Sequence, residues 1–295
     1  MPAKRILLTG ATGFLGSALA RHWASAGREV HALVRATSSR RRLEGIGSGL
    51  VVHVLDGVGA DAVVADVRPD AIVHTACAYG RAGESPRQIF EANLAFGIEL
   101  LQAVLAGDRH VTFINTGSVL DPDVSLYALS KRQFSDWGAQ LAPREPSLLR
   151  FVDLRLQHMY GAGDDPSKFT THVLQACLRN DPELMLTAGE QLRDFIHVDD
   201  VVSAYDVVLA QSDSLPAQEP IEVGSGNAPS IREFVETVHR LTGSTTQLSF
   251  GAIPYRANEA MLCRANTARL QSLGWRPTFD LASGLQETIR KESLQ

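Results

Sequence analysis

Short apolar runs alternate with amphipathic stretches along the first half of the chain. Runs rich in aliphatic and β-branched residues predict strands at 4–9, 28–34, 51–55, 71–75, 111–115 and 148–155. Apolar residues at helical spacing predict intervening helices at 14–26, 60–67, 86–106 and 127–142. This alternation is typical of βαβ units, which build a parallel sheet covered by helices on both faces.

Beyond residue 155 the pattern loosens into turns, such as GAGDDP and RNDPE, mixed with helices. Residues 199–211 predict a helix with Asp199 or Asp200 near its start. Ser230 and Glu233 form a capping-box pattern at the start of another helix, and Gly243 is placed to end it.

The pattern therefore predicts an α/β fold, a Rossmann-type doubly wound parallel sheet with a smaller, interleaved C-terminal α/β substrate domain. The nucleotide-binding domain takes residues 1–155 and about 197–222, and the substrate domain takes about 156–196 and 223–295. The cleft between two such domains is where we expect ligands to bind.

The amino-acid composition argues against nucleic-acid binding, membrane association and a cysteine-based metal site. The 295 residues carry 28 basic and 33 acidic side chains, a formal charge of −5, so bulk charge does not favour nucleic acid or a membrane surface. No apolar run is long enough for a signal peptide or a membrane span. The three cysteines are far apart and lack metal-ligand spacing, which indicates reduced thiols and no metal site. We expect a soluble cytoplasmic protein.

Three glycines punctuate the step from the first predicted strand to the first predicted helix. Gly10, Gly13 and Gly16 lie in LLTGATGFLGS. A pyrophosphate at a helix N-terminus needs close backbone approach, free N–H donors and the positive end of the helix dipole. The sequence thus predicts a dinucleotide site, whose contacting residues would be Gly10, Thr12, Gly13, Phe14, Leu15 and Gly16. The alternative is a tight turn that binds no ligand.

The end of the second predicted strand indicates which dinucleotide is bound. NAD sites usually have an acidic residue there for the ribose hydroxyl, whereas NADP sites have arginine for the 2′-phosphate. Here the strand ends HALVR, and no acidic residue follows before Glu44. Side chains that would hold the phosphate are Arg35, Ser38, Ser39 and Arg40. We predict NADPH or NADP as the cofactor, with NAD less favoured; a solvated basic loop is the alternative.

A series of motifs along nearly the whole chain resembles one family. In order they are TGATGFLG, HTACAYG, EANLAFG, INTGSV, YALSK, LRLQHMYGAGDD and RDFIHVDDVV. Together they resemble the extended short-chain dehydrogenase/reductase family, also called the NAD-dependent epimerase/dehydratase family. Around these motifs the sequence is most similar to the CDP-abequose and CDP-paratose synthases, which are 4-keto reductases of nucleotide sugars.

The resemblance implies a catalytic set of Thr116, Tyr127 and Lys131. Reduction of a ketone leaves an alkoxide that needs a proton, and a nearby ammonium makes the anion of a phenol accessible. Tyr127 and Lys131 are four residues apart, on one face of a helix. Lys131 would also hold the nicotinamide ribose. Thr116 would hydrogen-bond Tyr127 and the substrate oxygen, although Ser118 is a second candidate for that role.

The resemblance also implies further binding residues and an oligomeric state. Asp56 would bind the adenine amino group, and Ala76 would lie beside the pyrophosphate. Substrate-binding residues would be Ser118, His158, Lys168, Phe169, Arg193 and Arg256. Of these, Arg193 and Arg256 would clamp a diphosphate. The helices at 86–106 and 127–142 would form a homodimer.

Departures from the family pattern narrow the reaction. Gly117 and Ser118 follow Thr116 where dehydratases have an Asp-Glu pair, so the acid and base for water elimination are lacking. We therefore expect NADPH-dependent reduction of a nucleotide-diphosphate 4-keto-6-deoxy or 3,6-dideoxy sugar, as in O-antigen biosynthesis. A C4 epimerase with tightly bound NAD is the first alternative, and a non-catalytic NADP-sensing regulator is the second.

Overall fold

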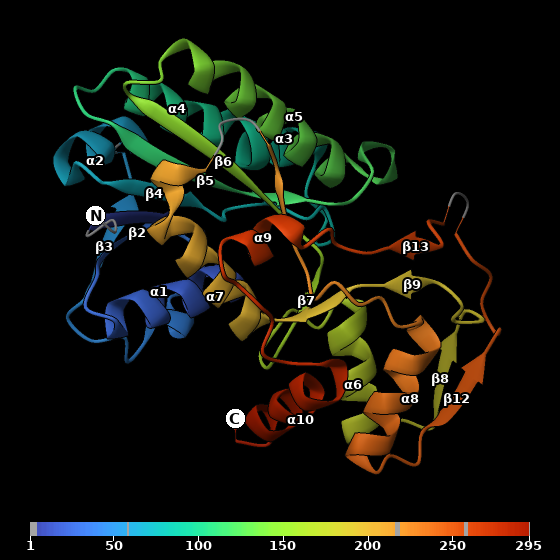
Figure 1. Ribbon diagram of the computed structural model, residues 1–295. Coiled ribbons are helices and arrows are strands. Elements are labelled where there is room, and N and C mark those ends of the chain that lie inside the picture. Colours follow the sequence, from blue (N-terminus) through green and yellow to red (C-terminus); the bar gives the residue numbers. More distant parts are fainter. Residues whose placement is uncertain (1–4, 58, 216–218, 257–258, 295) are drawn as a thin grey trace. The chain divides into compact units, whose positions relative to one another are not determined.

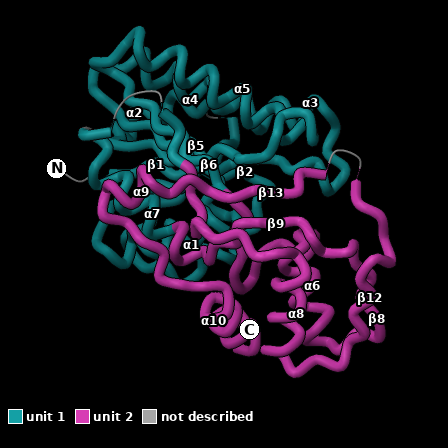
Figure 2. Tube along the Cα trace, turned by 45° about the vertical axis from the view of Figure 1, so that its right-hand side comes forward, with its two compact units in different colours: residues 1–156, 202–221 teal, residues 157–201, 222–295 magenta. Residues whose placement is uncertain are grey.

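The computed structural model describes residues 5–57, 59–215, 219–256 and 259–294. The chain divides into two compact units (Figure 2), which are described separately below. Unit 1 contains residues 1–156 and 202–221, and unit 2 contains residues 157–201 and 222–295. The role assigned to each predicted domain stays a prediction.

Unit 1 is built on a parallel sheet. Its seven-stranded order is β11 (Ile221–Val223), β6 (Leu149–Leu156), β5 (Val111–Ser118), β4 (Ala71–His74), β1 (Arg5–Thr9), β2 (Glu29–Arg35) and β3 (Leu50–Leu55). Strands β1 to β6 pair in parallel throughout. All six predicted strands are present, and β11, at the passage into unit 2, was not predicted. The Rossmann-type doubly wound fold is confirmed.

Helices cover both faces of this sheet (Figure 1). One face carries α2 (Ala60–Val67), α4 (Phe96–Leu105) and α5 (Leu126–Leu141), and the other carries α1 (Phe14–Ser25) and α7 (Val198–Ala210). Trp23 on α1 donates its indole N–H to Asp206 on α7 at 3.2 Å, which joins the two helices of the second face. On the first face the rings of Phe113, Phe134 and Phe151 pack together between the sheet and α5.

The single helix predicted at 86–106 is interrupted. It consists of α3 (Pro86–Phe90), a π-helical segment η2 (Glu91–Ala95) and α4. The wider turn contains Asn93, whose amide bonds to the backbone N–H of Ala78 at 2.6 Å and to its carbonyl at 2.9 Å. The same amide reaches the Ser130 hydroxyl at 2.9 Å. The π segment therefore aims Asn93 at the chain that follows β4.

Unit 2 contains α6 (Phe169–Arg179), α8 (Ile231–Thr242), α9 (Ala268–Ser272) and α10 (Leu281–Glu292). Three short parallel strand pairs accompany them: β7 (His158–Tyr160) with β10 (Phe195–His197), β8 (Glu183–Leu186) with β12 (Gln247–Phe250), and β9 (Leu192–Arg193) with β13 (Leu262–Cys263). The structure shows the Ser230 arm of the predicted capping box, accepting from the Glu233 N–H at 3.0 Å, and Gly243 ends α8 with φ 63°.

Four short 3₁₀ segments connect these elements: η1 (Arg41–Leu43), η3 (Pro122–Val124), η4 (Ala142–Arg144) and η5 (Ser212–Ser214). Within the part of the chain that the structure describes, none of the helices combines the length and apolar character needed to cross a bilayer.

Candidate active site

The turn between β1 and α1 has no room for side chains at two of its glycines. Gly10 has φ +67°, and a Cβ there would lie 2.5 Å from the Thr75 hydroxyl and 2.6 Å from the Ala76 nitrogen. A Cβ on Gly16 would lie 2.1 Å from the Gly10 carbonyl oxygen. Glycine is required at both positions, and the turn lies against Ala76.

The start of α1 presents backbone donors to a ligand. Gly13 is the N-cap residue, is exposed, and has no side chain to satisfy the first-turn N–H groups. Thr12 and Phe14 on either side of it are half-exposed, while Leu15 is buried beneath. A helix N-terminus without a side-chain cap, with its positive dipole end, suits a pyrophosphate, so the turn fits the predicted dinucleotide.

The basic loop after β2 lies beside this turn. Arg35 is exposed at the end of β2, and its carbonyl accepts the Ser38 N–H at 3.0 Å. The Arg42 guanidinium lies 5.9 Å from the ring centroid of Phe14. Ser38 is half-buried and Ser39 and Arg40 are exposed, so all the predicted phosphate ligands are accessible. Asp56 is exposed just after β3.

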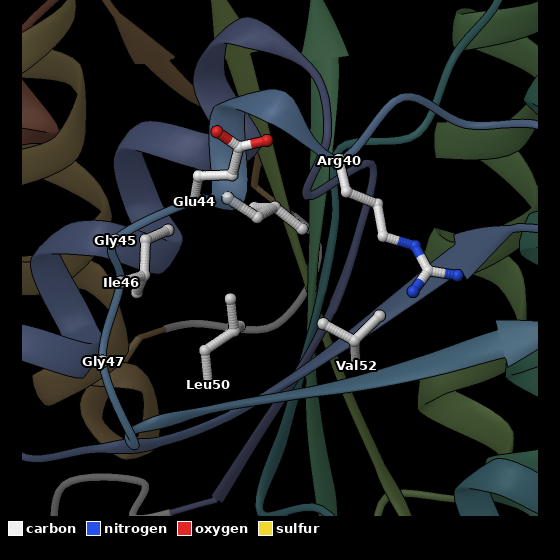
Figure 3. A pocket seen from close by; sticks show the side chains of 8 residues that line it. Arg40, Glu44, Gly45, Ile46, Gly47, Leu50 and Val52 are labelled. Carbon is white, nitrogen blue, oxygen red and sulfur yellow. The ribbon is translucent and has the colours of Figure 1, made fainter.

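An open pocket lies under the same loop (Figure 3). Its lining residues are Arg40, Leu43, Glu44, Gly45, Ile46, Gly47, Leu50 and Val52. The Arg40 side chain extends along one side toward Val52, with Ile46 and Gly47 across from it. None of the predicted catalytic residues lines this pocket, so it belongs to the surroundings of the basic loop.

Lys131 is a buried cation on α5. Its side chain is only 2% exposed, and among the described residues its Nζ has no hydrogen-bond partner. Burial lowers the pKa of the Lys131 ammonium, opposed by Cys77 and Asp153. An unpartnered buried ammonium is costly in the free protein. The position therefore fits a ligand that brings hydroxyl acceptors, as the ribose of a nicotinamide nucleotide would.

Tyr127 stands in the first turn of α5, which Ser125 caps by accepting the Ala128 N–H at 3.1 Å. Burial raises the pKa of the Tyr127 phenol above its usual value, opposed by the Arg81 guanidinium and the Ser118 hydroxyl. The ring of Tyr79 packs 4.8 Å away. The cation that opposes the rise is Arg81, and the expected effect of Lys131 on the phenol stays a prediction. At neutral pH the phenol keeps its proton.

The structure does not place Thr116 against Tyr127. The Thr116 hydroxyl is 2.7 Å from the hydroxyl of Tyr205 on α7. Strand residues alternate between faces, and neighbouring Asn115 faces α5, where it donates to Ser135 at 3.2 Å. Thr116 therefore points toward the other face. The Ser118 hydroxyl opposes the rise in the Tyr127 pKa, and which of the two hydroxyls contacts Tyr127 stays a prediction.

His74 lies under the site at the end of β4 and is fully buried. Its Nδ1 is 2.9 Å from the Thr9 hydroxyl, and its ring packs against Phe96, Phe113 and Phe134. Burial, aided by the nearby Lys131 ammonium, lowers the pKa of His74 to about 3. The imidazole is therefore neutral in the folded protein at any pH above that value.

This histidine should make the protein acid-sensitive. A histidine whose folded pKa is depressed takes up more protons when unfolded, so stability falls as pH drops below the unfolded value near 6.5 and stops falling near pH 3. Between pH 7 and pH 4.5 we expect His74 to cost about 2.5 kcal/mol of unfolding free energy. Urea unfolding at both pH values measures the loss, which His74→Asn should reduce. An equal loss in both proteins would contradict this account.

In unit 2, three of the predicted substrate-binding residues lie together. His158 on β7 is half-buried, and burial, followed by the Arg193 and Lys168 cations, lowers its pKa to about 4. Arg193 pairs with Glu259, and Lys168 with Asp164 at 3.0 Å. Each of the two cations beside this neutral imidazole is paired with a carboxylate, so an anionic ligand would have to share them with Glu259 and Asp164.

The other two predicted residues of unit 2 are more exposed. Phe169, the first residue of α6, is 37% exposed, with its ring 5.9 Å from that of Phe234. Arg256 is exposed, and its carbonyl accepts the N–H of Glu259, the residue that pairs with Arg193. Arg193 pairs with Glu259 and not with the adjacent Asp194. Asp194 instead accepts from the Ser225, Gly226 and Ala265 backbones.

Sequence reasoning missed three residues around Tyr127. They are Tyr205, Arg81 and Cys77, which all act electrostatically on its pKa. Cys77 directly follows Ala76, which the sequence analysis places in the cofactor site, so its position in the sequence could have indicated that it lies near Tyr127. Nothing in a single sequence links Tyr205 to Thr116, 89 residues earlier. Among the described residues, no group of three or more His, Cys, Asp or Glu side chains is arranged to hold a metal ion.

Known proteins resemble this chain over its whole length. The CDP-abequose synthase of Salmonella typhimurium strain LT2 is 29% identical over 300 residues, covering 97% of each chain. The UDP-glucose 4-epimerase of Thermotoga maritima, solved with UDP-glucose, superimposes with a TM-score of 0.82 at 20% identity, covering 99% of this chain and 100% of that one. The UDP-glucuronic acid 4-epimerase of Bacillus cereus, solved with UDP-glucuronic acid and NAD, gives 0.85 at 19% identity, covering 98% and 99%.

The model of the NAD dependent epimerase/dehydratase family matches residues 6–224, which include the glycine turn, Tyr127 and Lys131. The predicted resemblance is thus confirmed: the chain belongs to this family and is an NAD(P)-dependent oxidoreductase of the extended short-chain dehydrogenase/reductase type.

Proposed function

We propose that the protein is an NADPH-dependent reductase of a nucleotide-diphosphate 4-keto-6-deoxy or 3,6-dideoxy sugar. The observation that carries the proposal is the pair on α5: a phenol that keeps its proton, Tyr127, and a buried ammonium without a partner among the described residues, Lys131. The full-length similarity to a CDP-abequose synthase supports this substrate class.

The proposed roles of unit 1 follow from its geometry. The glycine turn would hold the pyrophosphate, Arg35, Ser38, Ser39 and Arg40 the 2′-phosphate, Asp56 the adenine, and Lys131 the ribose hydroxyls. The bound cofactor supplies a hydride to the carbonyl carbon. Tyr127 would then donate its proton to the alkoxide oxygen, and the hydroxyl of Thr116 or Ser118 would orient that oxygen.

Unit 2 would bind the nucleotide diphosphate. Arg193 and Lys168 supply positive charge, and neutral His158 supplies a ring nitrogen without a hydrogen-bond partner in the described residues. Arg256 extends the positive charge along the segment held by Glu259. Phe169, exposed at the start of α6, offers a ring face to the base.

An NADPH-oxidation assay against CDP-, dTDP-, GDP- and UDP-linked 4-keto sugars tests this proposal, with the product configuration read by NMR. We expect stoichiometric NADPH consumption with at least one substrate. Turnover of a nucleotide sugar without net oxidation would favour the alternative, a C4 epimerase with bound NAD, which the similarity to epimerase structures supports. If the protein binds NADPH but turns over none of these sugars, the result would favour the second alternative, a non-catalytic NADP-sensing regulator.

Cofactor preference provides a sharper test at Arg35. One charge-assisted contact to a phosphate contributes about 1.5–3 kcal/mol, which corresponds to roughly 10–100-fold in affinity. Arg35→Ala should raise the KM for NADPH by that factor and change the KM for NADH by less than about 3-fold. The matched control is Arg41→Ala, which removes an exposed arginine of the same loop. If both variants lose affinity for NADPH to the same extent, the loss reflects the general charge of the loop, and Arg35 makes no specific contact with the 2′-phosphate.

We also propose that the protein is a homodimer. Large apolar side chains are exposed on α3 and α5: Phe90 at 52%, Leu129 at 39% and Trp137 at 50%. Exposed apolar side chains grouped on neighbouring helices are typical of an interface. Sedimentation equilibrium should therefore give twice the chain mass of 31.9 kDa.

A further inference from the structure

The side of the sheet that faces α5 changes from apolar to polar at one level. Phe113 of β5 and Phe151 of β6 stack under α5, and the next residues on that side of the two strands are Asn115 and Asp153. These two are direct partners in the parallel pairing, and His74 of β4 is the partner of Asn115 on its other side. All three polar side chains are buried. Buried polar groups are costly, so a row of them across three strands calls for a reason.

The carboxylate of Asp153 accepts three hydrogen bonds. One oxygen accepts from the Asn115 amide at 2.7 Å and from the Ser135 hydroxyl at 2.9 Å. The other accepts from the Arg155 guanidinium at 3.0 Å. A Cβ on Gly117 would lie 2.5 Å from the first oxygen, so glycine at that position leaves room for the carboxylate. Donors of this kind favour the charged form, and Asp153 is therefore held as a buried anion.

Ser135 connects this anion to the turn of α5 that carries Lys131. The two residues are one helical turn apart on the same side of α5, and both are buried. The Ser135 hydroxyl lies 3.1 Å from the Lys131 carbonyl oxygen and 2.9 Å from Asp153. It has one proton, and the ionised carboxylate is the stronger acceptor. Asp153 therefore holds the turn whose buried ammonium has no hydrogen-bond partner in the described part of the chain.

Building on the proposed function, in which Lys131 binds the nicotinamide ribose, we infer that Asp153 is a positioning residue for Lys131. It anchors the Lys131 turn of α5 through Ser135 and supplies the negative charge that keeps the ammonium charged before the cofactor arrives. Arg155 also faces this carboxylate, but its side chain is 28% exposed, so water and salt screen its charge more than that of buried Lys131.

The pH dependence of cofactor binding should report this negative charge. The titratable groups around Lys131 are His74 and Cys77 on the β4 side, Asp153 on β6, and Tyr127 on α5 itself. Burial lowers the pKa of Lys131, and Cys77 and Asp153 oppose that effect. The pKa of about 3 for His74 and the raised pKa of Tyr127 keep both groups uncharged from pH 7 to about pH 9. Without the Asp153 charge, Lys131 should therefore lose its proton at a lower pH.

Fluorescence titration of NADPH between pH 7 and pH 10 tests this without turnover. In the wild type, the affinity should fall where Lys131 loses its proton. In Asp153→Asn, which keeps the shape of the side chain, that fall should come roughly one pH unit lower. Arg155→Met leaves the carboxylate in place and should not move the fall to lower pH. An unmoved fall in Asp153→Asn, or an equal downward shift in both variants, would overturn the inference.

The matched control is Asp206→Asn. Asp206 is a carboxylate of α7, on the opposite face of the sheet, and it also accepts from an arginine, Arg28, at 2.7 Å. This variant should bind NADPH with the pH dependence of the wild type, because its charge lies on the side of the sheet away from Lys131. A shift as large as that of Asp153→Asn would show that any lost carboxylate has the same effect, and would contradict a specific role for Asp153.

A double-mutant cycle in urea unfolding provides a readout without cofactor. Asp153→Asn should raise the unfolding equilibrium constant at least about 3-fold more in the wild type than in Lys131→Met, where no ammonium remains to be balanced. If Asp153→Asn alone does not fold, the double variant should still fold for the same reason. Equal costs in the two backgrounds, or loss of folding in both, would make Asp153 a purely structural residue. If the wild type binds no NADPH, the proposed function fails, and this cycle still decides the role of Asp153.

Discussion

Tyr127→Phe should lower kcat for keto-sugar reduction by roughly 10²–10⁴-fold while leaving the affinity for NADPH within a factor of about 2. The substitution removes only the phenolic oxygen, and the ring remains to pack against Tyr79 at 4.8 Å. The lost rate corresponds to the proton that the alkoxide no longer receives. Stopped-flow NADPH oxidation and NADPH fluorescence titration measure the two quantities.

The matched control for this variant is Tyr160→Phe. Tyr160 is a buried tyrosine of unit 2, so its replacement also removes one buried phenolic oxygen. It should retain more than about half of the wild-type kcat, because Tyr160 has no proposed role in the chemistry. A Tyr127→Phe enzyme within tenfold of the wild type would show that another group supplies the proton.

The sheet of unit 1 was predictable because burial on both faces makes each parallel strand a continuous apolar run. Runs such as Ile6–Leu8 and Ala71–Val73 are fully buried in the structure. The glycine turn was predictable for a local reason, since Gly10 and Gly16 have no space for a Cβ. Both signals lie within a few neighbouring residues, which is what a single sequence can express.

The short strand pairs of unit 2 carried no such signal. β9 and β13 have two residues each, and their paired residues are 70 positions apart, so pairing rather than pattern defines them. The break in the helix at 86–106 likewise depends on a distant contact, the bond of Asn93 to Ala78. Tertiary contacts of this kind override local propensity.

The candidate site likewise has a part that local sequence predicts and a part that depends on tertiary contacts. Tyr127 and Lys131 were predictable as one face of one helix, and both lie on α5. Which hydroxyl approaches Tyr127 was left open, because the sequence of β5 does not show which partner each hydroxyl has. Tyr205 engages Thr116 from a helix whose position the strand pattern of β5 does not encode.

Lys131→Met should abolish most of the activity and yet make the free protein more stable. Lys131 is 2% exposed, and burial lowers its pKa, so the ammonium is held at a cost that methionine of similar length does not incur. We expect roughly 1–3 kcal/mol of additional unfolding free energy without cofactor. The KM for NADPH should rise and kcat should fall by about 100-fold or more, because the ribose loses its contact.

Lys168→Met is the control for the stability measurement, because Lys168 is a paired lysine. Its ammonium lies 3.0 Å from the buried carboxylate of Asp164, and removing the cation of such a pair destabilises the charge that stays buried. This variant should lose stability under the conditions in which Lys131→Met gains it, as urea unfolding without cofactor measures. If Lys131→Met is instead destabilised to the same extent as Lys168→Met, then Lys131 is a structural cation of the free protein, and an unpaired ammonium reserved for the ribose is the wrong description. Opposite signs in the two variants, together with the kinetic loss at Lys131, identify the buried ammonium as a group kept for the cofactor at the expense of the free protein's stability.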